Sequence, residues 1–182
     1  MISLKGGAAL RDTGLFEYYA QNHQALDVMY DFVQEYNKDM AIPKDYGTGD
    51  LLYTLEAHML RYIRYNPGTT VSEISRYWGR NKATVSPQIS KLEQKGYVRK
   101  CKDPHNSRLT RLYLTDRGVA FDQAHEAYDK RETDYFLSRL REAYTEEEIH
   151  TFYQMLVDFK ELLSQRNASA GHVSPEEHPA KN

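Results

Sequence analysis

The side chains best suited to chemistry in this 182-residue chain are Lys and Arg residues gathered between Arg76 and Arg111. Ten basic residues lie in that segment and only Glu93 and Asp103 oppose them, so its formal charge is +8. The whole chain has a net charge of −2, which leaves −10 on the remainder. A basic patch on an acidic body is the electrostatic footprint of a protein that binds a polyanion. A solvated charged face is the alternative interpretation of the same charges.

Other kinds of chemistry have weaker support in the sequence. The chain contains no GxxxxGKS or GxxxxGKT phosphate loop and no Ser, His and Asp set in a recognisable catalytic context. Histidines are scattered without close ligand spacing, so we favour polar or interface roles for them and keep a metal site as the alternative: His23, His58, His125 and His150. We therefore expect no enzyme activity and no cofactor.

The expected location is the cytoplasm, away from membranes. Cys101 is the single cysteine, which excludes an intrachain disulfide and fits a reducing compartment. The sequence has no stretch that approaches 18 uninterrupted apolar residues, so we predict no membrane span and no membrane partner.

Apolar spacing and turn signals predict the elements that position the basic segment. Apolar residues recur in steps of three and four from Phe16 to Val33, which indicates one face of a long helix. Thr70 followed by Glu73 predicts a capping box at the start of a short helix. The other predicted elements are a helix over about 50–65, a helix capped by Asn81, strands at 97–101 and 109–114, and helices ending near 141 and 165.

Helix, short helix, tight turn, helix and hairpin follow one another in the order of a winged helix-turn-helix. The fold class is therefore mainly α with a small β-hairpin wing (α+β). The candidate recognition helix runs from Asn81 to Leu92, and its outward-facing side chains suit base edges and phosphates, although an ordinary solvated face would be equally polar: Lys82, Thr84, Ser86, Gln88 and Lys91. Pro87 removes a backbone hydrogen bond, so either the helix is kinked there or its regular part starts near Ser86.

Several motifs in this order resemble the MarR family of bacterial regulators. They are the run Asn81–Ser86, the sequence LEQKGYV at 92–98 and the sequence LYLTDRG at 112–118. The resemblance covers about residues 15–165 and implies a dimer with a wing-tip arginine that enters the minor groove of DNA. Arg108 occupies that position, and Asp103 matches the acidic residue that steadies the arginine. Ser107 replaces one of the two arginines usual at the tip, which predicts a weaker contact.

The resemblance also implies a domain organisation. Residues 14–165 form a single MarR-like domain, in which a winged-helix lobe over about 50–118 lies between dimerisation helices at about 14–40 and 119–165. Residues 1–13 are predicted to be a flexible arm and residues 166–182 a disordered tail.

The prediction for function is a DNA-binding transcriptional regulator, a homodimeric repressor that binds a pseudo-palindromic operator in double-stranded DNA. The predicted DNA contacts are Ser72, Arg76, Arg80, Asn81, Lys82, Thr84, Ser86, Gln88, Lys91, Lys102, His105, Asn106, Ser107 and Arg108. The aromatic content of the first two helices suggests a small aromatic effector in a pocket formed by Tyr19, His23, Tyr30, His58 and Tyr62, although core packing explains each residue individually. A winged-helix module that binds protein without sequence-specific DNA binding is the competing class, and the +8 charge disfavours it.

Overall fold

The computed structural model describes residues 25–170, which fall in two compact units. Residues 25–134 belong to the first unit and residues 135–170 to the second. The predicted arm at 1–13 and the candidate pocket residues Tyr19 and His23 lie outside the described residues.

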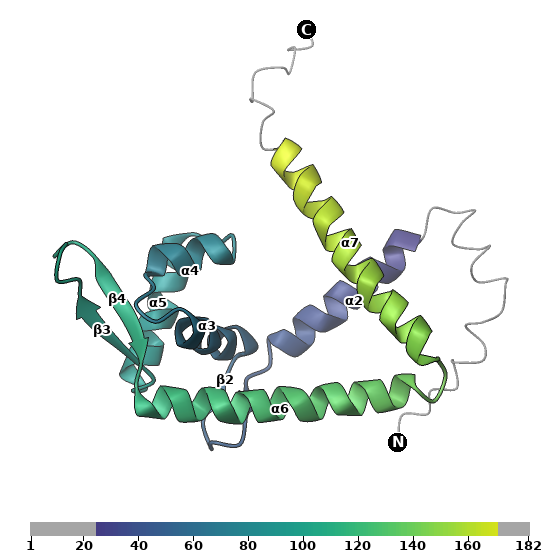
Figure 1. Cartoon of the computed structure of the whole chain (residues 1–182), viewed down its shortest axis with the longest axis horizontal. Helices are drawn as coiled ribbons and strands as arrows, with labels where there is room; N and C mark the ends of the chain where they lie inside the picture. Colours follow the sequence, from purple (N-terminus) through teal and green to yellow (C-terminus); the bar gives the residue numbers. More distant parts are fainter. Residues whose placement is uncertain (1–24, 171–182) are drawn as a thin grey trace, which may run out of the picture. The chain divides into compact units, whose positions relative to one another are not determined.

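Helices dominate the described chain, and one antiparallel hairpin projects from it (Figure 1). In chain order the elements are α2 (Ala25–Met40), β1 (Lys44–Asp45), β2 (Leu51–Leu52), α3 (Thr54–Tyr65), α4 (Val71–Tyr77), α5 (Lys82–Gln94), β3 (Val98–Lys102), β4 (Thr110–Leu114), α6 (Asp116–Leu140) and α7 (Glu146–Ala170). In the β3–β4 hairpin, Val98 lies opposite Leu114 and Lys102 opposite Thr110. The predicted fold class, mainly α with a β-hairpin wing, is confirmed.

Local hydrogen bonds explain why the lobe helices start where they do. The Thr70 hydroxyl accepts the Glu73 N–H at 3.3 Å, and the Glu73 carboxylate accepts the Thr70 N–H at 2.7 Å. This reciprocal pair is the predicted capping box of α4. It holds the pKa of the Glu73 carboxyl below its usual range, because the backbone N–H of Thr70 stabilises the charged form.

The core of the first unit forms where α3, α4, α5, the wing and α6 meet. Val85, Ile89 and Leu92 of α5 are fully buried, as their spacing predicts. They pack with other buried side chains, including Met59, Leu60, Ile63, Ile74, Leu112 and Phe121. Full burial of such side chains stabilises the fold by roughly 1.5–3 kcal/mol each. The recognition helix is thus fixed by one apolar face, which leaves its other side to solvent.

The small β1–β2 hairpin was not predicted. One carboxylate oxygen of Asp45 accepts the backbone N–H groups of Gly47, Thr48 and Gly49 at 2.8, 3.0 and 3.0 Å. Gly47 and Gly49 have φ values of +96° and +77°, which L side chains rarely adopt. The turn at residues 45–49 lies between α2 and α3, and its glycines favour a break in the helical structure. The strands β1 and β2 have only two residues each, which is too short for an alternating pattern to be recognised in the sequence.

Pro87 lies inside a helix that already starts at Lys82. The alternative in which the regular helix begins near Ser86 is therefore wrong. The Asn81 side chain accounts for the early start, since its oxygen accepts the Thr84 N–H at 2.8 Å. Pro87 cannot donate to the carbonyl of Ala83, and because Ala83 is exposed, water can satisfy that carbonyl.

The second unit consists of the end of α6 and the helix α7. A capping box formed by Thr145 and Glu148 starts α7. The helix then continues to Ala170, past the position after Gln165 where the tail was predicted to begin. Residues 166–170 contain no proline or glycine, so nothing in their backbone chemistry stops the helix. Within residues 25–170, no helix has the length and apolar character needed to cross a membrane.

Candidate nucleic-acid interface

The first turn of α5 presents a polar surface. Asn81 caps the helix and also accepts a hydrogen bond from the Thr84 hydroxyl at 2.8 Å. Lys82, Thr84 and Ser86 are all exposed on the turns that follow. A helix that shows a lysine and short hydroxyl side chains at its N-terminal end is suited to enter a major groove end-on.

The turn between α4 and α5 adds two exposed arginines to this surface. Gly79 adopts a φ of +58° at the turn, and the carbonyl of Ser75 accepts the Arg80 N–H at 2.9 Å. Arg76 and Arg80 are both exposed. The tight turn therefore places their positive charge next to the start of the recognition helix.

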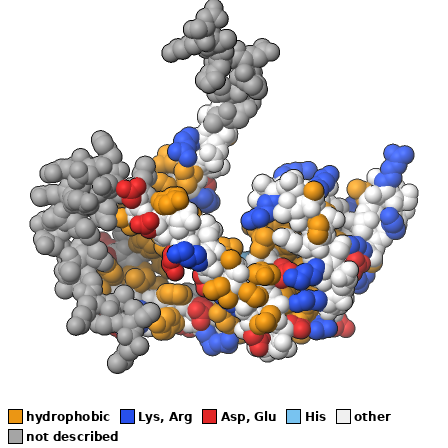
Figure 2. All heavy atoms as spheres, turned by 180° about the vertical axis from the view of Figure 1, so that it is seen from behind, with side chains coloured by type: hydrophobic (Ala, Val, Ile, Leu, Met, Phe, Trp, Pro, Cys, Tyr) orange, Lys and Arg blue, Asp and Glu red, His pale blue; other side chains and the backbone are white. Residues whose placement is uncertain are grey.

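Apart from Lys95, which donates to the carbonyl of Leu51, the basic residues of segment 76–111 divide into two groups in the structure. Three are held in ion pairs of 2.7 Å with acidic partners: Lys91 with Glu56, Lys100 with Glu93, and Arg111 with Asp103. Six exposed cations have no ion-pair partner among residues 25–170: Arg76, Arg80, Lys82, Arg99, Lys102 and Arg108. Figure 2 shows Lys and Arg side chains over this lobe and at its projecting tip. The second group supplies the charge available to a polyanion.

The wing loop is organised by Asp103. One oxygen of its carboxylate accepts the N–H groups of His105 and Asn106 at 2.8 and 3.0 Å. The other oxygen lies 2.7 Å from Nε of Arg111, whose Nη1 donates to the carbonyl of Gly68 at 3.0 Å. The Arg111 guanidinium holds the pKa of Asp103 below its usual range. The carboxylate thus links the loop to the base of the wing.

Asp103 was predicted to steady Arg108, and the structure corrects this detail. Its side-chain partner is Arg111, because the carboxylate turns toward the wing base rather than the tip. Arg108 is ordered through its backbone, where its N–H donates to Oδ1 of Asn106 at 3.1 Å. The exposed Arg108 side chain keeps its charge available at the tip.

Gln88 and Lys91 lie on the side of α5 that faces α3 and the end of α2, and Arg80 also reaches this side. Both line a groove of about 500 Å³ that α5 forms with α3 and the end of α2. The remaining lining residues include Asn37, Met40, Tyr53, Leu55, Glu56, Arg80 and Pro87. Oε1 of Gln88 is buried without a hydrogen-bond partner among the described residues. Helical spacing carries these two side chains toward the body of the protein.

The three described members of the candidate effector pocket have different surroundings. Tyr30 on α2 is 64% exposed. The His58 ring contacts the ring of His125 with centroids 5.1 Å apart, whereas the Tyr62 ring contacts Tyr77 and Trp78 at 4.6 and 5.3 Å. His58 and Tyr62 are one helical turn apart, yet they pack against α6 and α4 respectively.

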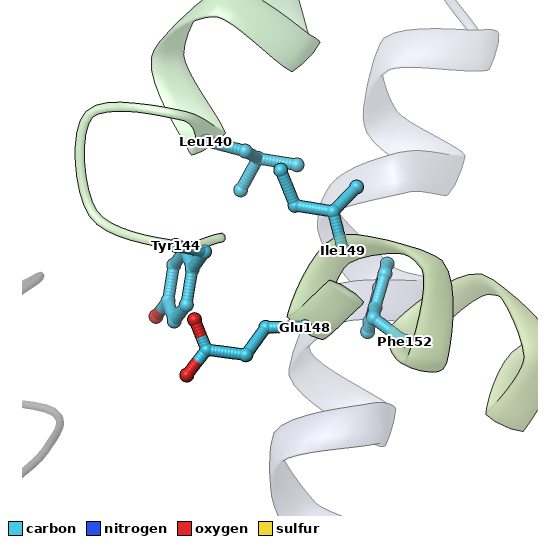
Figure 3. Close-up of a pocket in the computed structure, with 5 residues that line it drawn as sticks. All are labelled: Leu140, Tyr144, Glu148, Ile149 and Phe152. Atoms are coloured by element: carbon cyan, nitrogen blue, oxygen red, sulfur yellow. The ribbon is translucent and has the colours of Figure 1, made fainter. Parts of the chain in front are cut away.

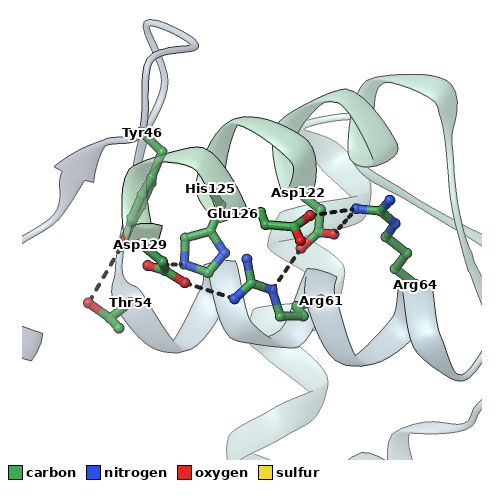
Figure 4. Close-up of polar contacts among 8 residues, drawn as sticks. All are labelled: Tyr46, Thr54, Arg61, Arg64, Asp122, His125, Glu126 and Asp129. Carbon is green, nitrogen blue, oxygen red and sulfur yellow. Dashed lines mark hydrogen bonds and ion pairs between the residues drawn. The ribbon is translucent and has the colours of Figure 1, made fainter. Parts of the chain in front are cut away.

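A buried polar cluster between α3 and α6 was missed by the sequence analysis (Figure 4). Asp122 is fully buried and pairs with Nε of Arg61 at 3.3 Å and with Nη1 of Arg64 at 2.6 Å. Arg61 also reaches Asp129 at 2.8 Å. The sequence contains one sign of this cluster. Arg61 and Arg64 are spaced to lie on one face of a helix, and so are Asp122 and Asp129 on another helix.

His125 lies at the centre of this cluster with an exposed fraction of 0%. Its Nε2 is 3.4 Å from Asp129, and neither ring nitrogen makes a hydrogen bond within residues 25–170. Burial lowers the pKa of His125 to about 4, because the imidazolium form would lose its hydration. Among the described residues, no three His, Cys, Asp or Glu side chains form a group able to hold a metal ion.

An apolar pocket of about 360 Å³ lies in the second unit, where α6 turns into α7 (Figure 3). It is lined by Leu140, Tyr144, Glu148, Ile149 and Phe152. All five lining residues belong to the segment 119–165, which was predicted to take part in dimerisation.

Comparison with known proteins finds similarity to transcriptional regulators in part of this chain and over most of its length. Residues 50–109 match the model of the MarR family. The uncharacterized HTH-type transcriptional regulator YhjH of Bacillus subtilis (strain 168) is 27% identical over 161 residues, which cover 87% of this chain and 90% of that protein. The HTH-type transcriptional regulator BilQ of Clostridioides difficile (strain CD3) is 37% identical over 59 residues, covering 32% of this chain and 40% of that protein.

Solved structures share the fold. The crystal structure of Streptococcus pneumoniae FabT in complex with DNA aligns with a TM-score of 0.59 at 21% identity, over 81% of this chain and 98% of that chain. The fold that this chain shares with it is a winged helix-turn-helix. Residues 50–109, which carry most of the basic surface, match the model of the MarR family, the family that the sequence resembles.

Proposed function

We propose that this protein is a homodimeric repressor that binds a pseudo-palindromic operator in double-stranded DNA. The N-terminal half of α5 enters the major groove, and the wing places Arg108 in the adjacent minor groove. The observation that carries the proposal is the set of exposed cations without ion-pair partners in the described chain, which spans the α4–α5 turn, the recognition helix and the wing.

The relative with a solved DNA complex supports this proposal. FabT, whose fold this chain shares, is described as a complex with DNA. At 21% identity the likeness concerns the fold alone, so the case for DNA contacts here depends on this chain's own residues. Lys82, Thr84, Ser86 and Arg108 are exposed and compatible with phosphate and base contacts.

Exposed apolar side chains on the terminal helices support the homodimer. Those of α2 and α7 include Val28, Tyr30, Phe32, Tyr36, Phe152, Met155, Val157 and Leu162. Soluble proteins rarely leave many large apolar side chains on one helix in water unless a partner covers them. A second copy of the same helices buries both sets and places two recognition helices for two operator half-sites.

Titration of DNA from the protein's own promoter region tests the proposal. Fluorescence anisotropy at increasing salt should show affinity falling by orders of magnitude between low and moderate ionic strength, because several Lys and Arg side chains displace counterions. An affinity independent of salt, or equal affinity for scrambled DNA, would argue for the winged-helix protein-interaction module instead.

Release of DNA by a small aromatic ligand remains part of the proposal. It is supported by the aromatic side chains of α3 and α4, where Tyr62, Tyr77 and Trp78 lie in mutual contact. A ligand acts only if it binds two conformations of the dimer with different affinity. A thermal-shift screen of aromatic compounds, followed by DNA titration with each stabilising compound, tests this part.

A further inference from the structure

Lys91 occupies an unusual position for a residue of the recognition helix. Its ammonium lies 2.7 Å from Oε1 of Glu56, whose side chain is only 5% exposed. The same ammonium stands over the ring of Tyr53, 5.3 Å from its centroid. The Lys91 side chain is 46% exposed, but its ammonium is engaged by two groups of the protein body, which compete with a phosphate for it.

Glu56 uses both of its carboxylate oxygens within the protein, one of them in the ion pair with Lys91. Its second carboxylate oxygen accepts the N–H of Tyr53 at 3.0 Å and so caps the start of α3. A buried carboxylate is costly unless it is paired and hydrogen-bonded, and here each oxygen has one partner. Lys91 is therefore needed to compensate the charge that caps α3.

Lys95 makes a parallel contact one helical turn further along α5. Its Nζ donates to the carbonyl of Leu51 at 2.9 Å, immediately before α3. Lys91 and Lys95 thus link the C-terminal half of α5 to the segment 51–56, while the exposed side chains of the N-terminal half have no such links.

We propose that Lys91 is a positioning residue: through Glu56 it fixes the orientation of the recognition helix for DNA binding and makes no contact with DNA itself. The inference rests on the proposed function. It separates the lysines of α5 into one that meets DNA, Lys82, and one that orients the helix, Lys91.

Salt dependence distinguishes the two roles. A lysine that contacts a phosphate releases about one counterion, so its removal lowers the slope of log affinity against log salt by about 1. Loss of a positioning residue leaves the number of phosphate contacts unchanged. It lowers the affinity for the specific site and affects non-specific binding little.

The experiment compares Lys91→Met, Glu56→Gln, the double variant and Lys82→Met as the phosphate-contact control. Anisotropy titrations use the promoter fragment and a scrambled fragment over a range of KCl concentrations. Lys91→Met should lose specific affinity by roughly tenfold, the size of one lost base contact, with the wild-type slope. Lys82→Met should lose about one unit of slope.

Glu56→Gln provides the sharper arm, because removing an acidic residue would strengthen DNA binding if charge alone mattered. We expect weaker specific binding instead, and a double variant no worse than the weaker single variant, since both residues act through one contact. Melting temperatures measured on the same samples show that each variant is folded at the titration temperature.

A slope reduced by one unit in Lys91→Met, or a gain of affinity in Glu56→Gln, would overturn the inference while leaving the proposed function intact. Absence of salt-dependent binding by the wild-type protein would overturn the proposed function and the inference with it.

Discussion

Arg108 is the exposed cation at the tip of the wing, and its loop is held by the hydrogen bonds of Asp103 and Asn106. Replacement by Ala should weaken binding to the specific site by roughly 1–3 kcal/mol, because the minor-groove contact is lost. Anisotropy titration of the promoter fragment measures this, and Arg131→Ala on α6 serves as the control. Unchanged affinity in Arg108→Ala would remove this residue from the interface.

Asp103 is expected to act on DNA binding indirectly. Asp103→Asn removes the charge that pairs with Arg111 and weakens the acceptor for two loop N–H groups. The wing should become less ordered, so amide hydrogen exchange at 105–108 should accelerate and DNA affinity should fall. Slow exchange in the variant, equal to that of the wild type, would contradict the role assigned to this carboxylate.

The sequence showed which side chains carry charge, but it did not show which of them form ion pairs with other parts of the protein. Lys82 and Lys91 were both predicted to contact DNA, because both lie on the polar face of the same predicted helix. Only the fold shows that Lys91 reaches a buried carboxylate from another helix. Partners far apart in the sequence leave no local pattern, which is also why the Arg61, Asp122 and His125 cluster was missed.

Caps and apolar periodicity predicted the helices of the lobe closely. Thr70 and Asn81 each cap a helix of the lobe as expected, because their hydrogen bonds are local. The β1–β2 hairpin depends on a single carboxylate binding three backbone N–H groups, a geometry that composition does not reveal.

The α4 cap gives a stability prediction. Thr70→Ala removes the acceptor for the Glu73 N–H and should lower the free energy of unfolding by about 1 kcal/mol. Urea denaturation followed by circular dichroism measures the change. Thr70→Ser retains the hydroxyl and should stay near the wild-type value, so an equal loss in both variants would contradict the capping role.

The contact between α3 and α6 should make the protein sensitive to acid. The pKa of His125 is lowered from 6.5 to about 4 in the folded state, so the unfolded chain binds more protons between these values. Stability should therefore fall as the pH drops through this window, by an amount on the order of 3 kcal/mol. The pKa of the neighbouring His58 is lowered in the same direction by burial.

Unfolding titrations from pH 7 to pH 4 test this prediction. His125→Phe should flatten the pH dependence of the free energy of unfolding in this range. A wild-type stability that does not decrease below pH 6.5 would show that His125 is protonated in the folded protein.

For the whole molecule, the account requires self-association through the terminal helices. Met155 on α7 is 64% exposed, and we expect Met155→Glu to shift the protein from dimer to monomer, because it places a charge in an apolar interface. Sedimentation velocity measures the change, with the exposed polar Gln154→Glu as the control. A wild-type protein that sediments as a monomer at micromolar concentration would refute the homodimer.

The distribution of charge along the chain indicated a polyanion-binding surface, although the net charge of −2 carries no signal. The +8 segment becomes informative because the fold pairs three of its cations with acidic residues and leaves others exposed without an ion-pair partner among residues 25–170. The family model over residues 50–109 covers nearly the same stretch as the predicted lobe. The partner copy and any effector leave no comparable mark in the sequence of a single chain.

The central claim is that the exposed cations of α5 and the wing bind an operator. The most direct measurement is a titration of wild-type protein against its own promoter DNA and a scrambled duplex over a range of salt concentrations. We predict tighter binding to the promoter and a steep, linear fall of log affinity with log salt. Equal binding to both duplexes, or binding insensitive to salt, would contradict the account.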